Sequence, residues 1–541
     1  MSDYEFTVYR GTFIQLSRLL PAPSSKPVLI RNQGALWVSV ADGRIKGCDW
    51  QAQDEESFTA LMHRNGWVDV DTFGAVNGVH RPSVKVKIVT ASEERNEFFF
   101  PGFIDTHIHA PQYPNVGLFG SSTLLDWLEK YTFPVESGLG DHPYEDDDLM
   151  GWLPRNAPAS AVRVYDQVIA RTLSHGTTCA SYFATIHVPA TNALALQCWA
   201  RGQRAFIGRV CMDNPEFCPS YYRDLSAEHS LESTQATTEF IHNIDPKGTL
   251  IKPIITPRFA PTCTSTALHK LGALAAAYSP PLHIQTHISE NINEVALVKK
   301  LFPESASYAA VYDTHNLLTP RTILAHAVHL SPDERKLIRA RKAKISHCPA
   351  SNSALGSGIA PVRTFLDEGI TVGLGTDVSG GYNPSILEAA RQACLASRLL
   401  GHTTAFVEAQ TQATVPLKTE NGETKEACLG REKLSVEESL YLGTRGGAAV
   451  VDMADDIGGF EIGMLWDVQL IELGAVPESS AGLSDTTVSR TDSGLPRSGP
   501  VGNVDLFGTE TWQEKIQKWV WGGDDRNVKA VWVGGRLVHS R

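Results

Sequence analysis

Two histidines separated by one residue are the first feature of this chain that could do chemistry. His107 and His109 stand in the apolar, strand-favouring run Phe103–His109. In an extended strand, residues two apart point to the same face, so the two imidazoles project together. Two neutral imidazoles at a strand end make half of a divalent metal site. A lone pair of this kind is more often ordinary core or surface histidine, so the interpretation depends on further ligands.

Further ligand types follow at the ends of later strand-like runs. Three imidazoles and one carboxylate would match the nitrogen and oxygen ligands of catalytic zinc or non-haem iron. One additional acid, Glu290, would then lie beside the metal as a proton carrier, a role that a non-ligand Glu plays in deaminases. The candidate residues after the first pair are His287 and Glu290 in the run 281–290, His326 in the run 322–329 and Asp377 in the run 371–381.

Strand-like runs alternate with helix-length segments through the middle of the chain. Alternation of this kind predicts parallel βα units, and eight of them close a (β/α)8 barrel of the TIM type. Every candidate ligand stands near the C-terminal end of its run, where barrel active sites are built. We therefore expect an α/β barrel over residues 101–460. The eight runs are 101–109, 176–187, 204–213, 250–259, 282–289, 323–329, 343–347 and 371–377.

The two ends of the chain share a different pattern. Residues 1–100 and 461–541 contain short strand-like pieces separated by Gly, Asp and Asn turns. Neither end can bury a core alone, so we expect them to pair into one small β-sandwich beside the barrel. The segments 411–426 and 477–503 are rich in polar and turn-forming residues, which indicates surface insertions without a core of their own.

Composition excludes several classes of function. The chain has 541 residues, of which 42% are hydrophobic and 20% charged, as in an ordinary globular protein. Its net charge of −12, without a Lys/Arg run, argues against nucleic-acid binding. We expect no signal peptide and no membrane partner, because neither an apolar leader nor a membrane-length stretch is visible. Nine scattered cysteines without a Cys-x-x-Cys pair suggest reduced thiols in a cytoplasmic protein.

Short strings along nearly the whole chain carry a family resemblance. The His-x-His pair, a strand-5 His, a strand-6 His and a strand-8 Asp together resemble the motif of the amidohydrolase superfamily. Longer strings are similar to those of the guanine deaminase family within it. These strings are Arg10–Phe13, Ile104–Tyr113, Lys130–Pro134, Thr256–Phe259, Thr286–Asn291, Ser346–Pro349, Gly523–Asn527 and Val531–Gly535.

The resemblance implies a hydrolytic deamination of guanine to xanthine and ammonia by a metal-activated water. One Zn²⁺ per subunit is expected, and Fe²⁺ would suit the same ligands. Lys252 opens its strand-like run, so it cannot reach the metal to bridge a second ion. The sequence leaves open whether His326 completes the metal shell or orients the water. The expected metal ligands are His107, His109, His287 and Asp377, and the expected catalytic residues are Glu290, Asp377 and His326.

Substrate contacts can be anticipated from side-chain chemistry. Gln112 follows the His-x-His pair, and its amide both donates and accepts, which suits a base edge of mixed polarity. Arg258 only donates, so it would favour the carbonyl at C6 of guanine over the amine of adenine. Phe259 can stack on a flat purine. Alternatively, Arg258 is an ordinary surface charge and Phe259 a core residue. The expected substrate-binding set is His109, Gln112, Arg258, Phe259, His287, Glu290 and Asp377.

The sequence is also compatible with two other functions. The same barrel could be an aminohydrolase for a triazine, a pterin or a different purine. It could also be a catalytically dead scaffold, although every chemical residue named above is present. Among partners, we expect the small-molecule substrate guanine, and the resemblance implies a homodimer.

Overall fold

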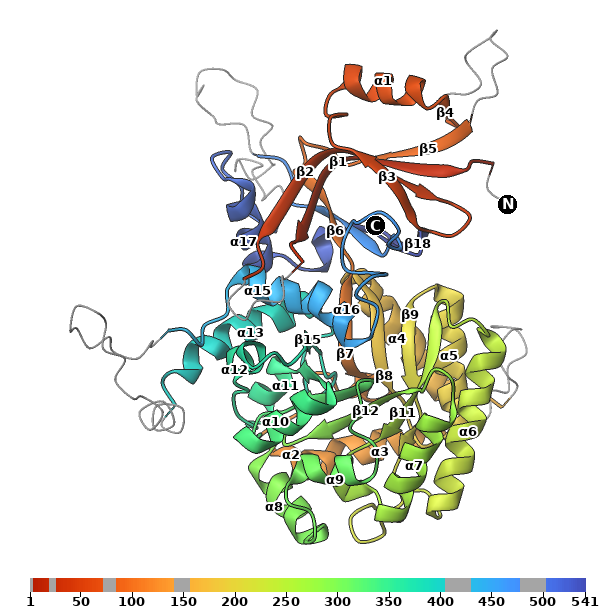
Figure 1. Cartoon of the computed structure of the whole chain (residues 1–541), viewed down its shortest axis with the longest axis vertical. Coiled ribbons are helices and arrows are strands. Elements are labelled where there is room, and N and C mark those ends of the chain that lie inside the picture. The colour runs from red at the N-terminus through yellow and green to blue at the C-terminus, as the bar shows by residue number, and fades with distance from the viewer. Residues whose placement is uncertain (1–2, 19–25, 72–83, 141–155, 404–429, 477–502) are drawn as a thin grey trace, which may run out of the picture. The chain divides into compact units, whose positions relative to one another are not determined.

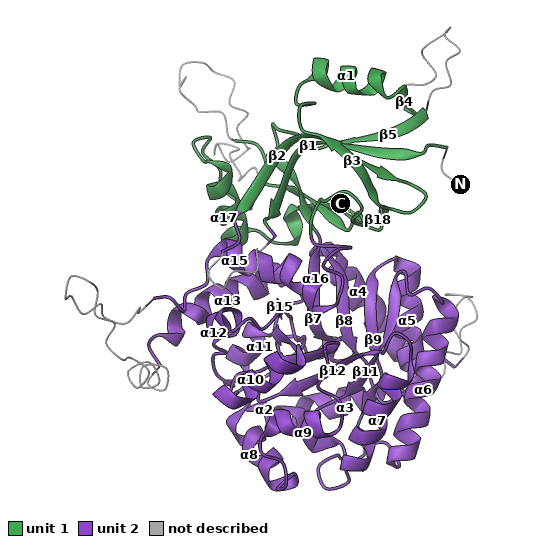
Figure 2. Cartoon of the chain, viewed as in Figure 1, with its two compact units in different colours: residues 1–17, 29–101, 459–541 green, residues 18–28, 102–458 purple. Residues whose placement is uncertain are grey.

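The computed structural model describes residues 3–18, 26–71, 84–140, 156–403, 430–476 and 503–541. The predicted insertion 411–426 lies outside these ranges, and so does 477–503 except for Asn503. The chain divides into two compact units (Figure 2). Unit 1 contains residues 1–17, 29–101 and 459–541, and unit 2 contains residues 18–28 and 102–458.

Unit 2 holds eight parallel strands with helices around them, which confirms the predicted (β/α)8 barrel (Figure 1). The hydrogen-bonded order is β15-β14-β13-β12-β11-β9-β8-β7, and the short β10 (Val210–Cys211) pairs with β11. Strands buried on both faces are expected in such a sheet, and all seven residues of β7 are buried. The strands are β7 (Phe103–His109), β8 (Thr177–Phe183), β9 (Arg204–Gly208), β11 (Ile251–Pro257), β12 (His283–Ile288), β13 (Thr322–His326), β14 (Lys344–His347) and β15 (Val372–Leu374).

The helices begin and end where local signals place them. The helix after β13 starts at Pro332, which suits a first helical position. Its cap, Ser331, exchanges hydrogen bonds with Glu334 in a capping box, and the helix ends at Lys342, whose φ is 56°. The helices of unit 2 are α2 (Leu124–Trp127), α3 (Phe133–Ser137), α4 (Ala159–Ser174), α5 (Val188–Arg201), α6 (Ala227–Ile244), α7 (Ser265–Ala277), α8 (Ile292–Leu301), α9 (Tyr308–Thr314), α10 (Pro332–Arg341), α11 (Pro349–Ala354), α12 (Val362–Asp367), α13 (Ile386–Leu400), α15 (Val436–Tyr441) and α16 (Gly447–Val450).

Hydrogen bonds at the C-terminal ends of the first and last strands close the barrel. The backbone N–H of Asp377 donates to the carbonyl of His107 at 2.8 Å, and His109 N–H donates to Val378 at 3.1 Å. Below them, the buried carboxylate of Asp105 accepts from the backbone N–H of Thr376 at 3.0 Å and from its hydroxyl at 2.5 Å. The bonds between Asp105 and Thr376 join residues that lie 271 positions apart in the sequence.

Unit 1 is a mixed sheet built from both ends of the chain, as predicted. The C-terminal β16 (Val468–Glu472) pairs antiparallel with β6 (Glu97–Pro101). A buried aromatic cluster supports the sheet, with the rings of Tyr9 and Trp466 only 4.2 Å apart. The remaining elements are β1 (Phe6–Leu16), β2 (Leu29–Ser39), β3 (Ile45–Asp49), α1 (Glu55–Arg64), β4 (Trp67–Asp69), β5 (Val84–Thr90), α17 (Trp512–Gly522), β17 (Val528–Val533) and β18 (Arg536–Ser540).

None of the helices in the described ranges combines the length and the hydropathy that a bilayer span requires.

Close packing of α7 yields a test of this fold. A Cβ added at Gly272 would lie 2.1 Å from the carbonyl oxygen of His315. Gly272→Ala should gain about 1 kcal/mol of helix propensity but lose more, because overpacking typically costs about 1–3 kcal/mol and here the obstacle is backbone. We expect a lower thermal unfolding midpoint. Gly138→Ala is the control, since its added Cβ meets no other atom of the described residues within 4 Å beyond its chain neighbours. Equal midpoints for the two variants would contradict this packing.

Candidate active site

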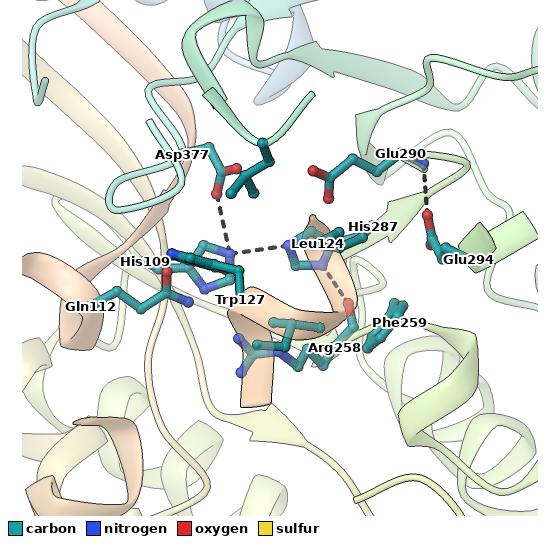
Figure 3. A pocket seen from close by; sticks show the side chains of 12 residues that line it. His109, Gln112, Leu124, Trp127, Arg258, Phe259, His287, Glu290, Glu294 and Asp377 are labelled. Atoms are coloured by element: carbon teal, nitrogen blue, oxygen red, sulfur yellow. Dashed lines mark hydrogen bonds and ion pairs between the residues drawn. The ribbon is translucent and has the colours of Figure 1, made fainter. Parts of the chain in front are cut away.

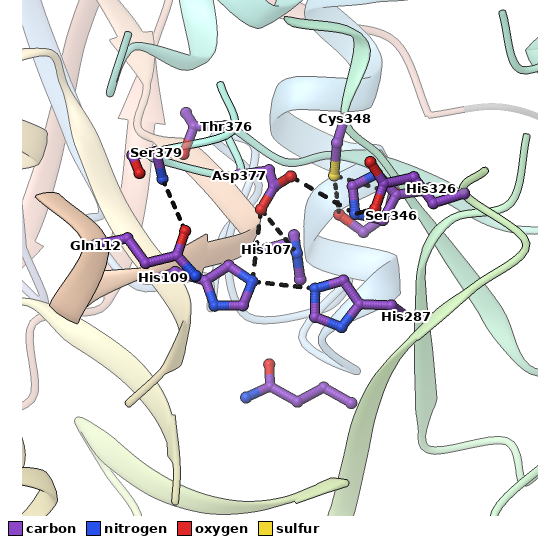
Figure 4. Close-up of polar contacts among 12 residues, drawn as sticks. His107, His109, Gln112, His287, His326, Ser346, Cys348, Thr376, Asp377 and Ser379 are labelled. Carbon is purple, nitrogen blue, oxygen red and sulfur yellow. Dashed lines mark hydrogen bonds and ion pairs between the residues drawn. The ribbon is translucent and has the colours of Figure 1, made fainter. Parts of the chain in front are cut away.

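Four ligand-type side chains converge at the C-terminal ends of the barrel strands (Figure 4). One donor atom from each lies within 4.8 Å of the others. The closest approach to the carboxylate is from His107, whose Nε2 lies 3.2 Å from Asp377 Oδ1. The four residues come from the ends of β7, β12 and β13 and from the turn after β15: His107, His287, His326 and Asp377.

His109 lies at the edge of this cluster. Its Nε2 is 3.0 Å from the Nε2 of His287 and 3.5 Å from Asp377 Oδ1. All five predicted metal-site side chains are therefore brought together. The tightest group of four contains His326, whereas the predicted ligand set contains His109 in its place.

Hydrogen bonds behind two of the imidazoles fix their orientation. His287 Nδ1 lies 2.6 Å from the carbonyl oxygen of Arg258, and His326 Nδ1 lies 2.9 Å from Asn352 Oδ1. Both acceptors require a proton on Nδ1, so each Nε2 presents a lone pair to the centre of the cluster. Among the described residues, no hydrogen bond reaches the buried Nε2 of His107 or His326. Buried nitrogens left in this way suit coordination to an ion.

The electrostatics of the cluster favour a cation. Burial lowers the pKa of His107, His109 and His287, which keeps these imidazoles in the neutral form that binds metals. Burial opposes ionisation of Asp377, but the surrounding histidines outweigh it and lower the pKa of that carboxyl. At His326, burial is outweighed by the charges of two carboxylates, which raise its pKa. The donor set therefore fits a divalent ion.

Glu290 lies beside the cluster with its own support. Its side chain is 3% exposed and accepts a hydrogen bond from the hydroxyl of Ser357 at 2.9 Å. Its Oε2 lies 3.4 Å from His326 Nε2, and its backbone N–H donates to Glu294 at 2.8 Å. Burial raises the pKa of Glu290 to about 7. A carboxyl that changes protonation near neutral pH suits general acid–base chemistry.

A pocket of about 380 Å³ opens at the cluster (Figure 3). All seven residues of the predicted substrate-binding set line it. Asp377 and Glu290 occupy the upper part of the view, and Gln112 and Arg258 the lower part. The sequence did not indicate the apolar wall, which comes mainly from α2 in the long first βα connection. These additional lining residues are Leu124, Trp127, Leu128 and Leu355, together with Glu294.

Arg258 is buried, so its interpretation as a surface charge is wrong. Its side chain is 2% exposed and forms a two-point ion pair with Glu136, at 2.6 and 3.0 Å. Gln112 donates to the same carboxylate at 2.8 Å, and Tyr222 donates to it at 2.7 Å. Phe259 both lines the pocket and packs in an apolar cluster with Phe217 and the α2 residues. The sequence does not predict a role for Glu136 or Tyr222, since neither belongs to a ligand motif.

Three other side chains of ligand or nucleophile type lie outside the four-residue cluster. His329 contacts the carbonyl oxygen of Ser357 through its Nε2 at 2.8 Å. Burial raises the pKa of the Cys348 thiol well above its usual value, which suits a packing role and not a nucleophile. Lys252 is the second residue of β11, at the end of that strand away from Arg258, and its ammonium lies 5.6 Å from the centre of the Phe206 ring.

The fold and the cluster agree with a match to a known family. Residues 98–538 match the family described as "Amidohydrolase family". The chain belongs to this family.

Particular relatives narrow the comparison to guanine deaminases. The chain is 46% identical to a probable guanine deaminase of Schizosaccharomyces pombe over 82% of its length and 71% of the relative's. It is 38% identical to the guanine deaminase of Homo sapiens, over 82% and 83% of the two chains, and 30% identical to that of Escherichia coli K12, over 100% and 99%. A solved guanine deaminase from C. acetobutylicum, with guanine bound in its active site, superposes with a TM-score of 0.70 at 27% identity, covering 99% of this chain and all of that one.

The cluster predicts how metal content responds to mutation. His107→Ala and Asp377→Ala should each empty the site of its metal ion, because each removes a donor atom from the centre of the cluster. Elemental analysis of the purified proteins should find close to one equivalent in the wild type and little in these variants. His269→Ala, on the exposed side of α7, is the control and should keep the ion. Undiminished metal in both cluster variants would exclude this site.

Proposed function

We propose that this protein is a metal-dependent guanine deaminase, which hydrolyses the C2 amine of guanine to give xanthine and ammonia. The observation that carries the proposal is one pocket that joins the histidine–aspartate cluster, Glu290 and the donors of Arg258 and Gln112. The relatives named above support the choice of guanine.

We propose His107, His109, His287 and Asp377 as ligands of one Zn²⁺, with Fe²⁺ as the alternative ion for the same donors. A bound divalent ion supplies water of lowered pKa, from about 16 to about 7. His326 Nε2 lies 3.4 Å from Glu290 Oε2, so we propose that His326 orients that water, with ligation of the ion as its alternative role.

Proton movements are proposed for two carboxylates. Glu290, with its pKa of about 7, can take the proton of the attacking water and deliver it to the purine ring nitrogen. Asp377 lies within 3.2–3.6 Å of three imidazoles, so its charge remains at the centre of the cluster. It can take the second proton of the added water oxygen and pass it to the amine, which leaves as ammonia. The apolar wall around Trp127 excludes water, which strengthens these interactions.

The opposite wall would bind the base. Arg258 has donors left beyond its two bonds to Glu136, and these suit the C6 carbonyl of guanine. The C2 amine then faces the metal side of the pocket, and Phe259 offers a ring against the purine plane.

Assembly and location are further proposals. A homodimer is proposed from the family resemblance. A cytoplasmic location is supported by the eight cysteines of the described ranges, all of which are free thiols. Triazine hydrolases superpose at only 18% identity, so they support the fold and not a triazine substrate.

Product formation tests the substrate directly. Purified protein is incubated with guanine, adenine, cytosine and a triazine, and ammonia and the deaminated base are followed. We expect ammonia and xanthine from guanine at a far higher kcat/KM than any product from the other three, because Arg258 donates to the C6 carbonyl. Faster turnover of adenine or a triazine would reject the guanine assignment, and no turnover by metal-replete protein would favour a dead barrel.

Glu290→Gln tests the proton carrier. The amide keeps the shape of the side chain but cannot shuttle a proton. We expect the metal content to stay at the wild-type value while kcat for guanine falls by about 10² to 10⁴, the usual span for general acid–base catalysis. Steady-state kinetics and elemental analysis on the same preparation measure both quantities. Near-wild-type turnover would assign the proton transfer to another group.

A further inference from the structure

Glu136 is a buried carboxylate that the proposed chemistry does not use. It lies on α3, in the first βα connection, and is fully buried. Three side chains from different parts of the barrel donate to it. Its Oε2 accepts from Arg258 Nη1 at 2.6 Å and from the Tyr222 hydroxyl at 2.7 Å, and its Oε1 accepts from Gln112 Nε2 at 2.8 Å and from Arg258 Nη2 at 3.0 Å.

These four bonds use the whole accepting capacity of the carboxylate. An ionised carboxylate offers about four acceptor positions, so Glu136 has none left for a ligand. Because it can only accept, Gln112 must turn its amide nitrogen toward it. The Gln112 oxygen, in turn, accepts from the backbone N–H of Ser379 at 3.3 Å. Burial and the charge of Glu136 raise the pKa of Tyr222, so the phenol stays protonated and donates. Glu136 thereby selects the groups that Gln112 and Arg258 present to the pocket.

The same contact sets the charge of the base-binding wall. Arg258 is the only cation among the residues that line the described pocket. Without Glu136, its buried charge would face the ligand unpaired and would attract anions strongly in these low-dielectric surroundings. With Glu136 at 2.6 Å, the pair is neutral as a whole, and Arg258 keeps N–H groups beyond the two that bind Glu136. A neutral donor surface of this kind suits a neutral base.

We propose that Glu136 is a specificity-determining positioning residue, which makes the pocket select neutral purines over anionic ones. The inference rests on the proposed guanine deaminase activity. Xanthine has a second carbonyl in place of the amine of guanine and loses a proton more readily, so it is partly anionic at pH values where guanine is neutral. Neutralising Arg258 therefore favours the substrate over its own product, and this aids product release.

A series of charge-neutralising variants tests the proposal by ligand binding, without a measurement of turnover. Binding of xanthine and of hypoxanthine to the metal-loaded enzyme is measured by calorimetry, below and above the pH at which xanthine ionises. Hypoxanthine keeps the C6 carbonyl but ionises at a higher pH, so the ratio of the two affinities cancels any general loss of pocket structure. In Glu136→Gln, the xanthine-to-hypoxanthine ratio at the higher pH should rise roughly tenfold or more, because Arg258 is then an unpaired cation.

Companion variants separate charge from structure. Arg258→Gln should shift the ratio in the opposite direction, and the double variant should return toward the wild-type ratio. Glu136→Asp keeps the charge, and Tyr222→Phe removes one of the four hydrogen bonds but no charge, so both should retain the wild-type ratio. An unchanged ratio in Glu136→Gln, or the same ratio in the two single charge variants, would overturn the proposal. If Glu136→Gln does not fold, Arg258→Gln and the double variant still decide it. Failure of the wild type to release ammonia from guanine would instead count against the proposed function.

Discussion

Closure of the barrel between its first and last strands is the constraint on which the site depends. The backbone bonds of Asp377 with His107 and of His109 with Val378 join the two ends of the barrel sequence at one point. The Asp105 carboxylate reinforces this closure from within, because it binds both the hydroxyl and the backbone of Thr376. Asp377 itself has a φ of 47° and His326 a φ of 72°, conformations that are costly for these residues. The surrounding strands therefore keep both residues in these conformations, in which their side chains face the cluster.

The pocket then combines two walls of different electrical character. On one side, imidazoles and carboxylates favour a cation and proton transfer, with Glu290 poised near neutral pH. On the other side, the charge of Arg258 is matched by Glu136, so the wall donates hydrogen bonds without carrying net charge. Apolar side chains such as Leu124 and Trp127 separate this chemistry from bulk water. A flat, neutral, polar base fits between these walls, and a metal-dependent hydrolysis fits at their junction.

The sequence predicted the barrel and the convergence of its ligands because both follow from local patterns. Strand-like runs with polar residues at their ends place His107, His287 and Asp377 on the same face of any parallel barrel. Glu136 and Tyr222 could not be predicted in this way. Through the packing of α3, Glu136 meets Arg258, and Tyr222 meets Glu136 from the connection before α6. Neither residue lies at a strand end. The choice between His109 and His326 as a ligand depends on sub-ångström placement, which no spacing rule encodes. Arg258 could be suspected, but its partner and its charge balance required the structure.

Anomalous diffraction from crystals of the purified protein, collected on both sides of the zinc absorption edge, tests the central claim most directly. That claim is that His107, His109, His287 and Asp377 hold one catalytic ion next to Glu290. We expect a single strong anomalous peak per chain, bounded by the Nε2 atoms of His107, His109 and His287 and by the Asp377 carboxylate. A peak that persists below the zinc edge and vanishes only below the iron edge would identify the ion as iron, and the proposed site would stand. The absence of any metal peak among these donors in active protein would contradict it.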